Sequence, residues 1–515
     1  MASVFPKVPT ISHRAAVCAL AVIVLANAGL SAANAVTRLP WWDEGIAVSS
    51  PYNLANHGVF GTTVQHGRGH PSQLEFPQYD RYTYWTLPLY MLTLAGWIRV
   101  FGASLISTRL LSVLFGNVLV IAWYLIVRRL VGSRLAGIVA ALFVAVDFSV
   151  ITAASTTRMD CMTAALGACG AAVYLGLRGK HLSLALLAGN TFAAAALMCH
   201  PVGAAQVLAL LVLILCLDRR SVGWRSLPLI ALPYVLFLSG WGLYILRAPD
   251  VALGQFRANA ANRTVGLTSP LTSIASDAAT RYWRYFYVVE HGASKLKALM
   301  LVEYILGIGL ALGLPALRKN SGVRAILAMA SVTYVALALI DGVKSPHYMI
   351  VTCTVFAALW GVVATSGLGR RTTAALVVVA GSGFLLVHVA AAVQRARADA
   401  FHKEFVPVIE FLKTNKAGDP APIIGPAELW FGLGPRAALL DDMRLGYYSG
   451  WRPRWIVTNK FYEDAFQDFR VHEPLVWRHD QDVLRQFDKV FSTKNLTVYC
   501  ERGTHLQPPA KANGE

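Results

Sequence analysis

The stretch Ser107–Val127 reads STRLLSVLFGNVLVIAWYLIV and is followed directly by Arg128 and Arg129. A helix needs about 20 mostly apolar residues to cross a bilayer, and this run supplies them. A pair of arginines after such a run is typical of a hinge on the cytoplasmic side of a membrane. The same pattern, an apolar segment and then a short basic hinge, recurs along most of the chain and indicates the fold class.

The composition also indicates a membrane protein. Hydrophobic residues make up 56% of the chain and charged residues only 14%, whereas a soluble domain has about 25% charged residues. A soluble fold of 515 residues could not bury this much apolar surface. The net charge of +18 comes from the hinges and forms no basic stripe, so we expect no nucleic-acid partner.

The pattern predicts a polytopic α-helical membrane protein with about eleven spans. The predicted spans are 15–37, 107–127, 135–154, 160–177, 182–200, 201–217, 227–246, 298–317, 323–340, 347–367 and 372–393. The basic hinges all fall on one side if the spans alternate, which places the N-terminus in the cytoplasm and the C-terminus outside. The first span ends in a sequence resembling a signal-peptide cleavage site, Ser31–Ala35, but its length favours a retained helix.

Domain boundaries follow from the same pattern. We expect a transmembrane domain over residues 1–394, with large outer loops at 38–106 and 248–297. An extracytoplasmic α/β domain is predicted over 395–507, and a disordered tail over 508–515. Within the first loop, Leu87–Phe101 predicts an interfacial or re-entrant helix because it is apolar but short. Within the second, Arg281–Tyr287 is aromatic and basic, as suits the lipid headgroup layer, although outer basic residues go against the positive-inside rule.

Ionisable residues gather on the predicted outer side, where charge beside the bilayer is costly and points to function. They occur after the first span, before the fourth, between the fifth and sixth, and between the ninth and tenth: Asp43, Glu44, Arg158, Asp160, His200, Lys344, His347 and Tyr348. Each group also has a structural alternative, such as a solvated interface acid, a helix cap or a polar turn.

Acids and cations on one outer face suit one kind of reaction. A lipid-linked phosphate sugar would donate its sugar to a hydroxyl group. A carboxylate would take the hydroxyl proton as general base. Cations, with or without a divalent metal, would stabilise the departing phosphate.

Short motifs in this order give the chain a resemblance to a known group. They are Asp43-Glu44, Pro88-Leu-Tyr90, Arg109-Leu-Leu-Ser112, Arg158-x-Asp160 and Lys344-x-x-His347-Tyr348. The chain resembles the GT-C glycosyltransferases of the protein O-mannosyltransferase and lipid A aminoarabinose transferase type, over about residues 15–365. Where the aminoarabinose type has an acid and then Lys-Pro-Pro before its Leu-Tyr, this chain differs. Glu75 or Asp80 is the candidate for that acid, and the spacing does not choose between them.

The resemblance implies a polyprenyl-phosphate sugar donor, an outward-facing site in the inner (plasma) membrane and inversion at the anomeric carbon. It implies Asp43 as general base with Glu44 as partner, and Asp160 as a second acid that positions substrate or, with Asp43, binds Mg²⁺ or Mn²⁺. Donor-phosphate contacts would come from Arg158, Lys344, His347 and Tyr348. Arg109 and His200 complete the predicted substrate-binding residues.

Two other functions are alternatives to glycosyl transfer to a lipid, glycan or protein hydroxyl. A lipid or solute transporter or flippase should carry ionisable groups near the bilayer midplane and often has repeated halves. The predicted spans are largely free of such groups, and no halves are apparent. A structural membrane subunit would need no acid cluster. Two roles are open for the C-terminal α/β domain. It could cover the site or hold the acceptor, or it could be a passive cap.

Overall fold

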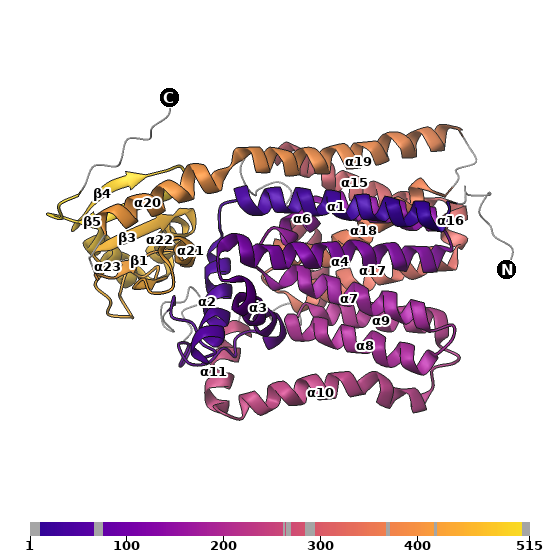
Figure 1. Ribbon diagram of the computed structural model, residues 1–515, viewed down its shortest axis with the longest axis horizontal. Helices are drawn as coiled ribbons and strands as arrows, with labels where there is room; N and C mark the ends of the chain where they lie inside the picture. Colours follow the sequence, from indigo (N-terminus) through magenta and orange to yellow (C-terminus); the bar gives the residue numbers. More distant parts are fainter. Residues whose placement is uncertain are drawn as a thin grey trace.

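Long apolar helices lie side by side in one bundle in the computed structural model (Figure 1). The structure describes residues 11–65, 76–260, 263, 269–283, 294–366, 371–416 and 420–506. The helices of the bundle are α1 (His13–Thr37), α4 (Leu105–Val131), α5 (Arg134–Val146), α6 (Phe148–Ala154), α7 (Met159–Leu177), α8 (Leu182–Cys199), α9 (Gly203–Asp218), α10 (Leu227–Ile245), α15 (Ser294–Gly313), α17 (Ser321–Ile340), α18 (Ile350–Ala364) and α19 (Arg371–Ala398).

Membrane-spanning character is clear in these helices. Within the described residues, eight helical segments are long and apolar enough to cross a membrane, or up to nine if the bent pair α5–α6 counts as one span. Two other predicted spans correspond to shorter apolar helices, α9 and the part of α15 at Ala298–Gly313. Each predicted span therefore falls on a helix or a bent pair, and the predicted class of polytopic helical membrane protein is confirmed.

The predicted span 135–154 is not one straight helix, because it bends by 62° between α5 and α6. The carboxylate of Asp147 causes the break by accepting hydrogen bonds from the backbone N–H groups of Ser149 at 2.8 Å and Val150 at 3.3 Å. An aspartate with these bonds is a strong start signal for a new helix. Tyr304 of α15 also donates its hydroxyl proton to Asp147, so the break is tied to a neighbouring helix.

Shorter elements connect the bundle helices. They are α2 (Trp42–His57), α3 (Pro88–Phe101), η1 (Trp224–Ser226), α11 (Pro249–Ala260), α13 (Pro270–Asp277), the π-helix η2 (Ala278–Trp283), α16 (Pro315–Lys319) and η3 (Pro346–Met349). Helices α2, α3 and α11 lie at the end of the bundle next to the C-terminal domain, and α16 lies at the opposite end (Figure 1). The short apolar helix predicted at Leu87–Phe101, interfacial or re-entrant, is present as α3.

Arg281 of the second outer loop does not face lipid headgroups as the sequence suggested. Its side chain is fully buried and forms ion pairs with Asp277 at 2.9 Å and Asp341 at 2.7 Å. Two carboxylates therefore neutralise this arginine, which accounts for a basic residue in a loop that is predicted to lie outside. The rest of the predicted headgroup segment, from residue 284 onward, lies outside the described residues.

The C-terminal domain follows α19 directly. Its elements are the π-helix η4 (Phe401–Phe405), α20 (Val406–Asn415), β1 (Ile423–Ile424), η5 (Ala427–Leu429), α21 (Trp430–Leu433), β2 (Leu439–Leu440), β3 (Trp455–Asn459), α22 (Lys460–His472), α23 (Pro474–Leu484), β4 (Phe487–Ser492) and β5 (Leu496–Glu501). The strand order is β2-β1-β3-β5-β4, with β1 parallel to β2 and β3, and β5 antiparallel to β3 and β4. The predicted α/β domain is confirmed, and the predicted tail 508–515 lies outside the described residues.

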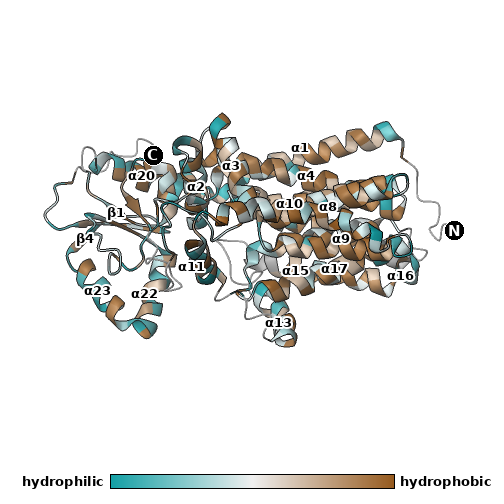
Figure 2. Cartoon of the chain, turned by 90° about the horizontal axis from the view of Figure 1, so that it is seen from below, coloured by the Kyte–Doolittle hydropathy of each residue, from teal (hydrophilic) through white to brown (hydrophobic). Residues whose placement is uncertain are grey.

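Among the described residues, the two largest hydrophobic clusters hold these parts together. One lies inside the bundle, whose helices are apolar along most of their length (Figure 2). The other is shared, because it joins Ile46 of α2 and Met91 of α3 to Val408 of α20 and Trp455 of β3. The C-terminal domain therefore packs on the helices of the first outer loop as part of one core.

Candidate active site

The first turn of α2 carries both predicted acids. Helix α2 begins at Trp42, and the backbone N–H of Trp41 donates to Glu44 Oε2 at 3.0 Å. Negative charge in a first helical turn is stabilised by the helix dipole. The two carboxylates leave this turn toward different partners, and that difference separates their roles.

Glu44 is buried in an ion pair with Arg109 of α4. Arg109 donates from Nε to Glu44 Oε1 at 2.9 Å and from Nη2 to Oε2 at 2.6 Å, and both side chains are fully buried. The backbone N–H of Thr157 donates to the same carboxylate at 2.7 Å. Burial acts to raise the pKa of Glu44, but the charge and hydrogen bonds of Arg109 outweigh it and leave the pKa below its ordinary value. Glu44 therefore links α2 by an ion pair to α4 and by a hydrogen bond to Thr157, just before α7.

Asp43 and Asp160 share one arginine. Arg158 donates from Nη1 to Asp43 and from Nε to Asp160 at 2.7 Å, and its guanidinium lies 4.8 Å from the ring centroid of Trp41. The side chain of Asp43 is 27% exposed, whereas that of Asp160 is 4% exposed. Of the two acids, Asp43 is thus the one that a substrate can reach.

Tyr348 is held between His200 and an arginine that the sequence did not single out, Arg263. The backbone N–H of Val202 donates to His200 Nδ1 at 3.2 Å, so the proton of a neutral His200 ring sits on Nε2. Burial first, and then the charges of Arg263 and Arg158, keep the pKa of His200 well below its ordinary value and the ring neutral.

The phenolic oxygen of Tyr348 then receives two hydrogen bonds. Arg263 Nη1 donates to it at 2.9 Å, and His200 Nε2 lies 3.2 Å away. A hydroxyl oxygen has two lone pairs, so both are used and the phenolic proton must point to another acceptor. Within the described residues no acceptor for this proton is found. Tyr348 is therefore poised to donate a hydrogen bond to a bound molecule.

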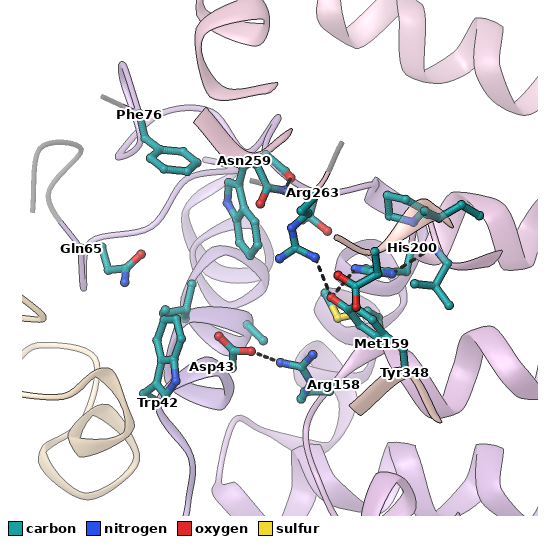
Figure 3. Close-up of a pocket in the computed structure, with 18 of the residues that line it drawn as sticks. Trp42, Asp43, Gln65, Phe76, Arg158, Met159, His200, Asn259, Arg263 and Tyr348 are labelled. Carbon is teal, nitrogen blue, oxygen red and sulfur yellow. Dashed lines mark hydrogen bonds and ion pairs between the residues drawn. The ribbon is translucent and has the colours of Figure 1, made fainter. Parts of the chain in front are cut away.

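These side chains meet at one cavity of about 200 Å³ (Figure 3). Figure 3 shows Asp43 pointing toward Arg158 on one side, and Arg263 and His200 pointing toward Tyr348 on the other. The lining residues are Trp42, Asp43, Ile46, Ala47, Gln65, Phe76, Tyr79, Trp85, Thr86, Arg158, Met159, His200, Pro201, Val202, Asn259, Arg263, Ile340, Asp341 and Tyr348. The cavity thus combines a reachable carboxylate, two guanidinium groups and several aromatic rings.

The structure brings only part of the predicted set to this cavity. Asp43, Arg158, His200 and Tyr348 line it, whereas Glu44 and Arg109 are buried away from it. Asp160 joins His347 in a smaller adjoining recess. The ring of His347 stacks on Trp41 with 4.2 Å between the centroids.

Lys344 does not line the cavity, although Asp341 before it and Tyr348 after it do. Its ammonium donates to the Ser273 hydroxyl at 2.6 Å and to the Ala338 carbonyl at 2.5 Å, and lies 3.3 Å from Asp277. Its backbone has φ +59°, which turns the chain after Asp341. The predicted phosphate contact is thus engaged in a buried network beside the cavity.

Glu75 and Asp80 are the two alternative acids of the first loop. Glu75 lies outside the described residues. Asp80 is exposed and does not line the cavity, while its neighbours Phe76, Tyr79 and Trp85 do. Beyond α2, the first loop thus reaches the cavity through these aromatic side chains together with Gln65 and Thr86.

The residues do not fit a resident divalent metal at Asp43 and Asp160. The guanidinium of Arg158 is bonded to both carboxylates and occupies the position that a bridging cation would need. In the described ranges, no group of three His, Cys, Asp or Glu residues is arranged to hold a metal ion. Asp160 Oδ1 is buried and has no hydrogen-bond partner among the residues that the structure describes.

Sequence reasoning missed Gln65, Asn259 and Arg263, all of which line the cavity. Gln65 and Asn259 belong to no motif, so no sequence signal marks them. Arg263 does carry one signal, because it is a basic residue in a loop predicted to lie outside, where the positive-inside rule disfavours it.

Comparison with known proteins identifies the fold. No family model matches the chain, and no curated protein sequence matches it. Among solved structures, ArnT from Cupriavidus metallidurans bound to undecaprenyl phosphate is similar with a TM-score of 0.56 and 14% identity, covering 95% of this chain and 99% of that one. The Archaeoglobus fulgidus oligosaccharyltransferase in its apo form is similar with a TM-score of 0.55 and 10% identity, covering 95% of this chain and 75% of that one. The same protein in complex with Zn and sulfate is similar with a TM-score of 0.54 and 11% identity, covering 94% of this chain and 73% of that one. The chain therefore has the GT-C glycosyltransferase fold.

Proposed function

We propose that the protein is a membrane glycosyltransferase that moves a sugar from a polyprenyl-phosphate donor to a hydroxyl of an envelope lipid, glycan or protein. The observation that carries this proposal is the cavity in which Asp43 faces Arg158, with Arg263 and Tyr348 across from it. The fold adds support, because the similar ArnT structure holds undecaprenyl phosphate.

In this proposal Arg263 and Tyr348 bind the donor phosphate. Arg263 supplies a positive charge, and Tyr348 supplies the phenolic proton that has no acceptor among the described residues. Hydrogen bonds from a guanidinium to phosphate oxygens are short and strong. Preorganised donors of this kind stabilise the charge that develops on a leaving phosphate.

Asp43 acts as general base in the proposed transfer. The acceptor hydroxyl loses its proton to Asp43 while its oxygen forms the new bond to the anomeric carbon. The bond between that carbon and the phosphate oxygen breaks on the opposite face, and its electron pair leaves with polyprenyl phosphate. Attack opposite the leaving group inverts the anomeric carbon. Arg158 forms an ion pair with Asp43 and holds its carboxylate in place.

The remaining predicted residues receive supporting roles. We assign Glu44 and Arg109 to placing α2, since they form a buried pair at 2.6 Å. We assign Asp160 to orienting Arg158, to which it binds at 2.7 Å. Lys344 stabilises the turn before η3, and His347 supports Trp41 by stacking.

An apolar groove offers a place for the prenyl chain. It has a volume of about 920 Å³ and lies between η2, α15, α17 and α18, with Tyr282, Ile308, Leu327 and Phe356 in its wall. Its lining from Leu301 to Leu312 follows about 16 Å of helix α15. Tyr282 lines the groove, and its sequence neighbour Arg281 is paired with Asp341, which lines the cavity.

In this proposal a divalent cation would compete with Arg158 for the carboxylates of Asp43 and Asp160. One similar structure is a complex with Zn and sulfate. For Mg²⁺ or Mn²⁺ to be held by Asp43 and Asp160, the Arg158 side chain would first have to move away. We therefore assign the charge-stabilising part to arginines.

We place the cavity on the outer side of the inner (plasma) membrane, with the N-terminus in the cytoplasm. The basic hinges support this orientation. Helix α1 starts at the end of the bundle where α16 and its basic residues lie, and the C-terminal domain is at the other end (Figure 1). Basic residues concentrate on the cytoplasmic side of membrane proteins.

One feature favours a transporter as the second candidate. His388 and Glu303 are ionisable groups on bundle helices, 3.6 Å apart, and His388 lies 3.8 Å from Asp147. The predicted spans are therefore less free of ionisable groups than the sequence indicates. Sugar transfer remains the proposal, because the guanidinium groups and the reachable carboxylate line a cavity at the end of the bundle.

The test uses purified protein in lipid nanodiscs with a panel of radiolabelled polyprenyl-phosphate sugars. We expect release of polyprenyl phosphate and labelling of a hydroxyl acceptor, and about 100-fold or more lower turnover in Asp43→Asn. Asp250→Asn, an exposed acid of α11, is the matched control. Full activity of Asp43→Asn would remove the base role, and donor movement across the bilayer without bond cleavage would favour the transporter.

A further inference from the structure

Three of the contacts between the C-terminal domain and the first loop lie close to Asp43 or the cavity. The first is Gly45 of α2, two residues after Asp43. A β-carbon built on Gly45 would lie 2.1 Å from the carbonyl oxygen of Ala427 and 2.7 Å from the backbone nitrogen of Glu428. Only a glycine allows α2 and η5 to approach this closely.

The second contact joins two aromatic rings. Trp42, the first residue of α2, stacks on Phe461 of α22 with 5.0 Å between the centroids and 14° between the planes. Trp42 is also part of the cavity wall. The ring of Phe461 therefore supports a wall residue directly beside Asp43 from outside the cavity.

The third contact is a main-chain hydrogen bond. The backbone N–H of Asp441 donates to the carbonyl of Val64 at 2.7 Å, and Gln65, the next residue, pairs with Asp441 in a parallel bridge. Gln65 lines the cavity. All three contacts thus end on residues in or next to the cavity, and they share the hydrophobic core that joins α2 to the domain.

We infer that the C-terminal domain positions the catalytic carboxylate, with Phe461 as a positioning residue that holds Trp42, and thereby the first turn of α2, in place. This inference rests on the proposed function, in which Asp43 is the base. It goes beyond a passive cap, because the domain would be required for the geometry of the reacting groups. A displacement of about 1 Å at a reacting group can lower turnover by as much as about 100-fold.

Hydrogen–deuterium exchange of α2 in the full-length protein tests the inference without relying on activity. In Phe461→Ala we expect the amides of residues 42–57 to exchange faster, and kcat to fall about tenfold with little change in the KM for the donor. Phe461→Tyr keeps the ring and should restore both. Tyr447→Ala is the matched control, because Tyr447 is as exposed as Phe461, at 38%, and lies on the same domain away from α2.

Gly45→Ala provides a second variant that leaves Phe461 intact. Its added methyl group collides with the Ala427 carbonyl, so the domain must shift and the α2 amides should again exchange faster. Unchanged exchange of α2 in a folded Phe461→Ala protein would overturn the inference, even if activity fell. If the wild type transfers no sugar from any donor, the proposed function fails, while the exchange data still decide whether the domain holds α2.

Discussion

His200 Nε2 lies 3.2 Å from the phenolic oxygen of Tyr348, and this contact makes the tyrosine a donor toward the cavity. The direction of the bond is set two residues away, where the backbone N–H of Val202 occupies His200 Nδ1. Arg263 fills the second lone pair of the same oxygen. A neutral histidine and a main-chain amide thus determine where a tyrosine proton points.

Tyr348→Phe should lower kcat/KM for the donor about 10- to 100-fold, because a hydrogen bond to a charged group contributes about 1.5–3 kcal/mol. Steady-state kinetics with a polyprenyl-phosphate sugar measures the change. His200→Ala should have a smaller effect in the Tyr348→Phe background than alone, since the two residues act through one hydroxyl. Additive effects of the two substitutions would contradict the arrangement.

Glu44→Gln should destabilise the protein strongly. It leaves the fully buried Arg109 without a charged partner, and breaking a buried pair costs about 3–5 kcal/mol. The thermal unfolding midpoint in detergent measures the loss. Asp218→Asn is the comparison, because its pair with Arg178 is partly exposed, at 30% for the arginine, and should contribute less. Equal midpoints for the two variants would show that the Glu44 pair is not a structural tie.

Stability of the docked C-terminal domain should fall as pH rises. Burial raises the pKa of Glu428 to about 8 and that of Asp441 to about 7, from ordinary values of 4.5 and 3.8. Between about pH 4 and pH 8 the folded form binds more protons than the unfolded form, so stability decreases through this window and levels off above it. Unfolding midpoints at several pH values measure the slope. Glu428→Gln should flatten it, and an unchanged slope would exclude Glu428 as its source.

Removal of divalent metal should leave sugar transfer intact. Arg158 already bonds to both Asp43 and Asp160, so the carboxylates need no cation to share their charge. Turnover is compared before and after dialysis against EDTA, with Mg²⁺ and Mn²⁺ added back. Loss of activity that only a metal restores would show that Arg158 leaves its position during the reaction. Arg158→Lys is then the variant to examine, because it keeps the charge but loses the paired N–H donors.

The sequence predicted the elements better than the contacts between them. Apolar runs and basic hinges predicted the spans, since membrane insertion depends on local composition. The break at Asp147 was not predicted, because an aspartate cap competes with a continuous helix only when neighbours such as Tyr304 accommodate its charge. The β strands of the C-terminal domain fall on short apolar runs such as Trp455–Val457.

The site was predicted in part for the same reason. Asp43, Arg158, His200 and Tyr348 lie at span ends, where an ionisable residue is conspicuous, and they reach the cavity. Glu44 stands next to Asp43, yet adjacent residues of a helix point about 100° apart, so only one faces the cavity. The role of Lys344 depends on Ser273 and Ala338, and such long-range partners leave no mark in a local pattern.

The core shared by α2, α3 and the C-terminal domain has a consequence for biosynthesis. Ile46 and Met91 emerge from the ribosome well before their partners Trp455 and Val498 in the C-terminal domain. Contacts this distant in sequence form late in folding. The loop that bears Asp43 therefore completes its packing only after the C-terminal domain has been synthesised, and a product truncated before that domain would insert into the membrane with an unfinished site.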